Sequence, residues 1–117
     1  MEKKFINTNK SPAPIGPYNQ AILKGNTLFI SGQIALDPES MKLNNGSINN
    51  ETHQVMMNLK NILEEANMSF NDVVKSSIFL SDMSLFKDVN EIYGSYLTIG
   101  NEPARETIAV KTLPLNV

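Results

Sequence analysis

The spacing of apolar and polar positions changes along the chain, and each change marks a predicted element. Strand-like alternation and short apolar runs predict strands that begin at Phe5–Ile6 and continue at 18–24, 27–33, 73–80 and 106–113. Apolar residues at helical spacing predict two helices, at 50–67 and 84–97, with Asn50 as the first N-cap. The order β-β-β-α-β-α-β favours an α+β fold with both helices on one face of a sheet.

Turn residues separate the second and third predicted strands. Gly25-Asn26 stands between them, and glycine accepts the positive φ that a two-residue hairpin turn demands. A loop punctuated by proline and glycine at 11–17 precedes this pair, and a polar segment at 35–47 follows it. We therefore expect an antiparallel hairpin here.

A sheet that carries helices on one face leaves its other face open. The 117 residues fit a single domain spanning 1–117, so this face must be polar or covered by partner subunits. We expect the chain to assemble with copies of itself through it.

Composition narrows the function classes. The chain has no cysteine, so it has no disulfide, thiol nucleophile or thiolate metal site. Its net charge of −2 argues against the many phosphate contacts of general nucleic-acid binding. No apolar run reaches the roughly twenty residues of a membrane helix, and the N-terminus turns polar too early for a signal peptide. We expect a cytoplasmic protein with no nucleic-acid or membrane partner.

One basic residue differs from the others. Of the ten basic residues nine are lysine, and Arg105 is the only arginine. A guanidinium binds a carboxylate or phosphate through two parallel hydrogen bonds, whereas a lysine ammonium acts as a point charge. Arg105 follows Pro103 near the start of a predicted strand. The residues favour an anion-binding arginine there, with a structural arginine as the alternative.

Tyr18 is the second candidate. The turn Gly16-Pro17 delivers its hydroxyl at the start of a strand, and a tyrosine packed at a strand end fits the same pattern.

The other titratable residues favour solvated positions. His53, the only histidine, falls in the first turn of a helix, with no cysteine or second histidine to share a metal ion. The acids Glu64-Glu65 and Asp88…Glu91 fall on predicted helices, where solvated faces are the simplest interpretation. The glycines form no phosphate-binding loop. We expect neither a metal ion nor a cofactor.

Five segments, taken in order, resemble the RidA/YjgF family of reactive-intermediate deaminases over nearly the whole chain. They are Ile15-Gly16-Pro17-Tyr18-Asn19-Gln20-Ala21, Leu28-Phe29-Ile30-Ser31-Gly32-Gln33-Ile34, Asn58-Leu59-Lys60-Asn61-Ile62-Leu63, Asn90-Glu91-Ile92-Tyr93 and Pro103-Ala104-Arg105.

The resemblance implies a chorismate-mutase-like fold, in which a mixed β-sheet carries two helices on one face. It implies a homotrimer around a central barrel, with ligand clefts between subunits. The implied activity is that of a 2-iminobutanoate/2-iminopropanoate deaminase. Such a hydrolase acts on C–N bonds and converts reactive enamines and imines, for example 2-aminoacrylate, to 2-keto acids and ammonia.

The resemblance also implies a site made of Arg105, Tyr18, Ser31, Gly32, Asn90 and Thr107. Arg105 would bind the carboxylate next to the reacting carbon, and Tyr18 would help to orient water or the imine nitrogen. Gly32 would let the backbone approach the ligand closely. Thr107 stands where many members of the family have a cysteine.

One departure from the family lies at the C-terminus. Members usually continue past the Leu-Pro stretch into another strand, which bears a glutamate thought to activate water. This sequence ends at Val117, shortly after Leu113-Pro114, so we expect the domain to lack that strand. The alternative function is therefore a non-catalytic protein of the same fold that binds small carboxylates such as 2-keto acids.

Overall fold

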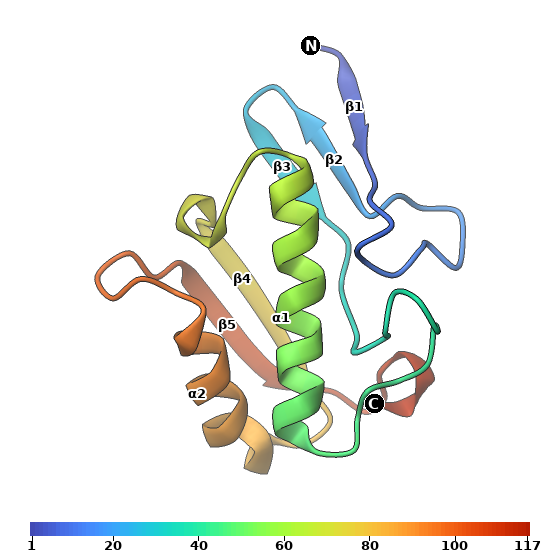
Figure 1. Ribbon diagram of the computed structural model, residues 1–117. Coiled ribbons are helices and arrows are strands. Elements are labelled where there is room, and N and C mark those ends of the chain that lie inside the picture. Colours follow the sequence, from blue (N-terminus) through green and yellow to red (C-terminus); the bar gives the residue numbers. More distant parts are fainter.

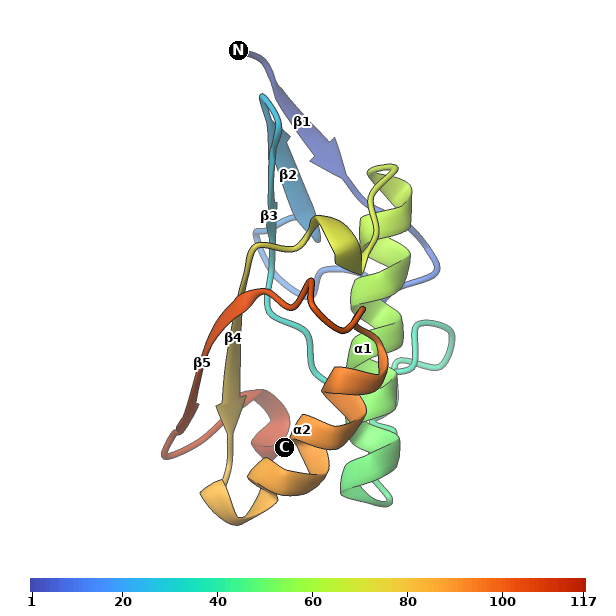
Figure 2. The same cartoon turned by 90° about the vertical axis from the view of Figure 1, so that its left-hand side faces the viewer.

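The computed structural model describes residues 1–117 as two layers, with the strands in one and both helices on the same side of them (Figures 1 and 2). The helices and strands follow the predicted order, so the α+β class is confirmed. Short 3₁₀ helices are added at 70–72, 83–85 and 114–116.

The first three strands form an antiparallel sheet in chain order. They are β1 (Lys3–Ile6), β2 (Ala21–Lys24) and β3 (Thr27–Ile30). The predicted hairpin joins β2 to β3, and Gly25 has a φ of 61° in its turn. Both strands are shorter than the predicted 18–24 and 27–33. One reason is that the backbone N–H of Gln20 donates to the Asn7 side chain at 3.0 Å instead of extending the ladder.

The helix α1 spans Ile48–Glu65 and begins two residues before the predicted start. Its N-cap is Ser47 rather than Asn50, because the Ser47 hydroxyl accepts a hydrogen bond of 3.1 Å from the Asn50 backbone N–H. Beyond the other end, Asn67 has a φ of 58°, a left-handed conformation that continues no helix.

The second half of the chain forms a β-α-β unit. The strands β4 (Lys75–Leu80) and β5 (Ala104–Ala109) pair in parallel, and α2 (Phe86–Ser95) connects them. The predicted last strand, 106–113, was therefore placed too far along the chain. The observed bounds of β5 follow from the register, because β4 supplies pairing partners for residues 104 to 109.

One feature of the predicted sheet differs. β3 pairs with β2 alone and β4 with β5 alone, so the strand layer consists of two sheets rather than one. Pairing needs a neighbouring strand at about 4.8 Å, and no strand of this chain bridges β3 and β4. Figures 1 and 2 show α1 running alongside both sheets, on the same side of them as α2.

The core lies between the strand layer and the helices. Its buried apolar side chains are Ala21, Ala35, Leu36, Met56, Ile62, Leu63, Leu80, Val89 and Ile92. Neither helix is both long and apolar enough to cross a membrane.

The opposite face of the sheets is open. Phe29, Phe79 and Ile108 alternate with inward-facing residues and are 62%, 50% and 46% exposed. Beside them, Glu106 forms an ion pair with Lys75 and accepts a hydrogen bond from the hydroxyl of Ser77. The face thus combines exposed apolar side chains with one charged pair.

Candidate functional site

Arg105 lies on β5 and faces α2. Side chains alternate along a strand, so Arg105 and Thr107 point towards the helices while Glu106 and Ile108 point outward. Arg105 is half-buried, and it pairs with Ser76 of β4 in the parallel ladder. The strand thereby delivers the guanidinium to the seam between β5 and α2.

A side chain of α2 binds the guanidinium. Nη1 of Arg105 donates a hydrogen bond of 2.6 Å to Oδ1 of Asn90. This is the only hydrogen bond of the Arg105 side chain, so it uses one of the five N–H donors of a guanidinium. The structure thus brings together two residues of the expected site and leaves most of the donors for a ligand.

Two aromatic rings of α2 lie close to the same guanidinium. Cζ of Arg105 lies 5.4 Å from the ring centroid of Phe86 and 5.2 Å from that of Tyr93. Both rings belong to the apolar residues at helical spacing that predict the helix at 84–97, and that pattern alone does not indicate a contact with the arginine. The sequence does show that these side chains share a helical face, since Phe86, Asn90 and Tyr93 stand at i, i+4 and i+7.

Thr107 adds a polar group beside the arginine. It lies two residues along β5 on the same side of the sheet, and its hydroxyl oxygen is buried without a hydrogen-bond partner. An unsatisfied buried hydroxyl is costly, so a ligand atom bonded there would stabilise this region.

Tyr18, Ser31 and Gly32 form a second group, next to the ends of β2 and β3. The Tyr18 hydroxyl accepts a hydrogen bond of 3.2 Å from the backbone N–H of Ile15, which folds the side chain back onto its own loop. Ser31 Oγ donates to the carbonyl oxygen of Asn19 at 2.7 Å. The Ser31 proton is therefore engaged, and its oxygen remains available as an acceptor.

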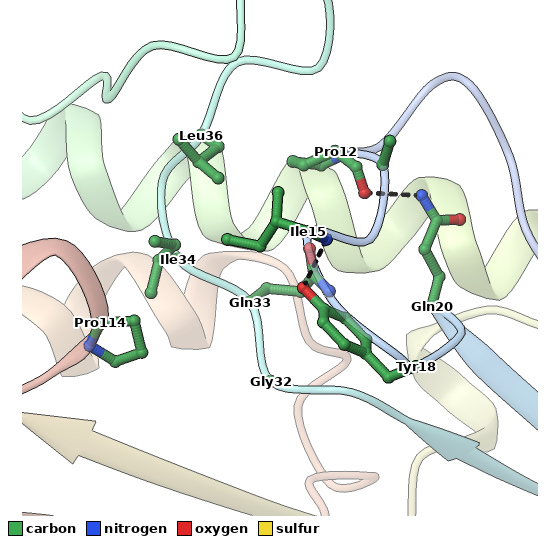
Figure 3. A pocket seen from close by; sticks show the side chains of 10 residues that line it. Pro12, Ile15, Tyr18, Gln20, Gly32, Gln33, Ile34, Leu36 and Pro114 are labelled. Atoms are coloured by element: carbon green, nitrogen blue, oxygen red, sulfur yellow. Dashed lines mark hydrogen bonds between the residues drawn. The ribbon is translucent and has the colours of Figure 1, made fainter.

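A cavity of about 100 Å³ lies beside Tyr18 (Figure 3). Its walls come from the 12–20 loop, the 32–36 segment and Pro114, and they include the backbone of Gly32. None of the residues around Arg105 lines this cavity. Within one chain the expected site residues therefore fall into two groups, one at α2 and β5 and one at Tyr18.

Buried amides hold the second group in place. Gln20 is 2% exposed, and its Nε2 donates to the carbonyl oxygens of Thr8, Ser11 and Pro12 at 3.0, 3.1 and 2.8 Å. Asn58 of α1 donates to the backbone carbonyls of residues 34 and 36. Both amides lie in segments that resemble the family, and the sequence pattern alone indicates no role for them.

The residues expected to be solvated are exposed. His53 is exposed, and its Nδ1 lies 2.9 Å from the hydroxyl oxygen of Tyr96, whose pKa is raised by burial. The helical acids are exposed as well, namely Glu64, Glu65, Asp88 and Glu91.

Known proteins resemble this chain over almost its full length. Residues 8–117 match the sequence profile of the family described as Endoribonuclease L-PSP. A RutC family protein of Pyrococcus abyssi is 46% identical over 117 residues, which cover 100% of this chain and 91% of the relative. The mouse protein named 2-iminobutanoate/2-iminopropanoate deaminase is 46% identical over 112 residues, which cover 96% of this chain and 82% of the mouse protein.

The fold agrees with these matches. The crystal structure of RidA from an Antarctic Psychrobacter species superimposes with a TM-score of 0.91 at 42% identity. The match covers 97% of this chain and 90% of that one. Sequence and fold together show that the chain belongs to the RidA/YjgF family.

Proposed function

We propose that the protein is an enamine/imine deaminase, which hydrolyses 2-imino acids to 2-keto acids and ammonia. The observation that carries this proposal is the state of Arg105. The only arginine of the chain is held at the seam of β5 and α2 by a neutral amide, with most of its donors free. The name of the mouse relative supports the same reaction class.

The substrate chemistry explains why an arginine is needed. Every 2-imino acid carries a carboxylate attached directly to the carbon of its C=N bond. A guanidinium that binds both carboxylate oxygens fixes the direction of the imine carbon relative to water. Addition of water to the protonated imine forms a C–O bond, and loss of ammonia breaks the C–N bond. One imine and one water thus give one 2-keto acid and one ammonia.

Tyr18 is the residue that we assign to water or to the imine nitrogen. It belongs to a different group from Arg105 within one chain, so the assignment requires a neighbouring subunit to complete the cleft. The exposed apolar face of the sheets supports assembly with further copies, and we propose a homotrimer. Ser31, Gly32, Asn90 and Thr107 would line the completed cleft.

A coupled assay tests the proposal. A pyridoxal-phosphate dehydratase acting on serine or threonine supplies the imine, and the release of keto acid is followed with and without the protein. We expect acceleration by the parent and its loss in Arg105→Ala. Lys87→Ala, which removes an exposed cation of α2, should retain the parental rate. The deaminase proposal fails if the parent gives no acceleration over buffer, or if Arg105→Ala is as active as the parent.

The second candidate is a carboxylate-binding protein that performs no chemistry. The observation in its favour is that the polar partner of Arg105 is an amide and that of the Tyr18 hydroxyl is a backbone N–H. At neutral pH neither an amide nor a backbone N–H transfers a proton to an imine. Calorimetry with 2-oxobutanoate separates the candidates. Binding that depends on Arg105 without any acceleration supports the second, and absence of such binding removes it.

RNA is not the substrate that we propose, although the matched profile is named for an endoribonuclease. The chain has a net charge of −2 and no stripe that combines basic and aromatic residues. Ribonuclease activity that persists in Arg105→Ala after stringent purification would contradict this choice.

A further inference from the structure

Tyr93 contacts Arg105 and is itself anchored. Its hydroxyl donates a hydrogen bond of 2.9 Å to Oγ of Ser76 on β4. Ser76 is also the residue that pairs with Arg105 across the β4–β5 ladder. Through Tyr93, α2 therefore contacts both strands. The ring lies beside Arg105 of β5, and the hydroxyl binds Ser76 of β4. A tyrosine ring bound at its hydroxyl end cannot swing away from the guanidinium without breaking that bond.

Phe86 is the second aromatic side chain close to the guanidinium. Phe86 and Tyr93 are seven residues apart on α2, which corresponds to a rise of about 10.5 Å along the helix axis. Cζ of Arg105 lies at nearly equal distances from the two rings, 5.4 and 5.2 Å. Both distances fall within the range of about 6 Å over which a cation is attracted to an aromatic face.

Asn90 further restricts the orientation of the Arg105 guanidinium. It stands between Phe86 and Tyr93 along α2 and accepts from Nη1. The edge of the guanidinium that does not involve Nη1 is the one formed by Nε and Nη2. This edge offers two parallel N–H groups, the arrangement that meets the two oxygens of a carboxylate.

We propose that Tyr93, anchored by Ser76, is a positioning residue that holds the Arg105 guanidinium with its Nε–Nη2 edge presented to a ligand carboxylate. Fixing the side chain before the ligand arrives removes an entropic cost that binding would otherwise carry. The identity of the ligand rests on the proposed function, whereas the immobilisation of the arginine does not.

The composition of the chain makes this immobilisation directly measurable. Because Arg105 is the only arginine, labelling with nitrogen-15 arginine gives a single Nε–H signal in an NMR spectrum. Its order parameter reports how firmly the guanidinium is held. Tyr93→Phe keeps the ring and removes the hydroxyl, while Ser76→Ala removes the acceptor. The backbone amide spectrum verifies that each variant keeps the fold.

We expect both variants to lower the order parameter of Arg105 Nε. Both should also weaken pyruvate binding between about two- and tenfold, the range that one hydrogen bond contributes. The double variant should lose no more than either single variant, since both remove the same bond. Tyr96→Phe is the matched control, because this tyrosine follows on the same segment but its hydroxyl contacts Nδ1 of His53. It should leave the Arg105 signal and the affinity unchanged.

The proposal is overturned if the Arg105 signal is unchanged in Tyr93→Phe and Ser76→Ala. It is equally overturned if the signal loosens while pyruvate affinity stays at the parental value. Failure of the proposed function gives a different result. If the parent binds pyruvate but hydrolyses no imine, deamination fails while the positioning role is still decided by the signal and the affinity. If the parent neither binds pyruvate nor accelerates hydrolysis, the Arg105 signal alone decides whether Tyr93 holds the guanidinium.

Discussion

Arg105 is bonded to the neutral amide of Asn90, at 2.6 Å between Nη1 and Oδ1, and it forms no ion pair within the chain. An amide acceptor orients the guanidinium without compensating its charge. The full positive charge therefore remains available to an anionic ligand. A carboxylate at the same position would orient the side chain equally well but would compete with the ligand.

Asn90→Asp tests this distinction. The new carboxylate would pair with Arg105 in a charge-assisted hydrogen bond, which contributes about 1.5–3 kcal/mol. We expect the affinity for pyruvate, measured by calorimetry, to fall by about tenfold or more, since each 1.4 kcal/mol corresponds to a factor of about ten. Glu91→Gln is the control, because it alters an exposed charge on the next residue of α2. Unaltered affinity in Asn90→Asp would show that the charge of Arg105 is not used for binding.

Arg105→Lys separates charge from geometry. Lysine keeps the positive charge but offers no planar fork, so it binds a carboxylate as a point charge. We expect KM for the imine, or Kd for pyruvate, to rise by about tenfold, the effect of losing one charge-assisted hydrogen bond. The loss in Arg105→Ala should be larger. A lysine variant with parental kinetics would mean that any cation suffices here.

Part of this arrangement was predictable from the sequence, because it depends on local patterns. The change of period near residue 50 separates the strands from α1, and the scarcity of arginine singles out Arg105. The cap of α1 was misplaced because Ser47 and Asn50 are both good N-cap residues. Local preference alone does not choose between them.

The remainder depends on contacts between distant segments. The i, i+4, i+7 spacing places Phe86 and Tyr93 on one face of α2, but the core and an arginine on β5 are equally suitable targets for such a face. Only the β4–β5 register, which pairs Ser76 with Arg105, decides where the rings lie. The division of the strands into two sheets also depends on contacts between distant segments, because the residue pattern of a strand does not predict which other strand it pairs with.

Gln20→Leu should destabilise the loop that carries Tyr18. The substitution leaves three backbone carbonyls and the N–H of Thr8 without their present partner. We expect a decrease of about 3 kcal/mol in the free energy of unfolding, measured by urea denaturation, because unsatisfied buried groups cost about 1–3 kcal/mol each and some of them will find water. Gln33→Leu, which loses a single bond of 3.2 Å to the carbonyl of Ser31, should cost less. Equal decreases in the free energy of unfolding for the two variants would show that the amide of Gln20 stabilises the fold no more than that of Gln33.

Ile108→Glu tests the open face of the sheets. A charge placed beside Phe79, its partner in the β4–β5 register, should prevent burial of this face by another copy. Light scattering coupled to size-exclusion chromatography should show a homotrimer for the parent and smaller species for the variant. Ile99→Glu makes the same change at a residue that is 95% exposed in the connection from α2 to β5, and it should retain the parental mass. A parent that is monomeric at all concentrations would contradict the proposed trimer.

Glu106 on the same face should make stability depend on pH. Hydrogen bonding from Lys75, assisted by Ser77, lowers the pKa of the Glu106 carboxyl below its ordinary value of 4.5. The charged form is therefore favoured by folding. The contribution of the Glu106 carboxylate to the free energy of unfolding is present above pH 4.5, and it is lost as the pH falls through the lowered pKa of the folded state.

Glu106→Gln removes this contribution. We expect the variant to have a lower urea midpoint than the parent at neutral pH, and we expect the difference to shrink as the pH falls below 4.5. Glu65→Gln removes an exposed acid of α1 that makes no ion pair, so it should give no such convergence. High salt should also reduce the difference at neutral pH, because an exposed pair is screened. A difference between the Glu106 variant and the parent that is constant from acid to neutral pH would show that packing, and not the charge of Glu106, stabilises this face.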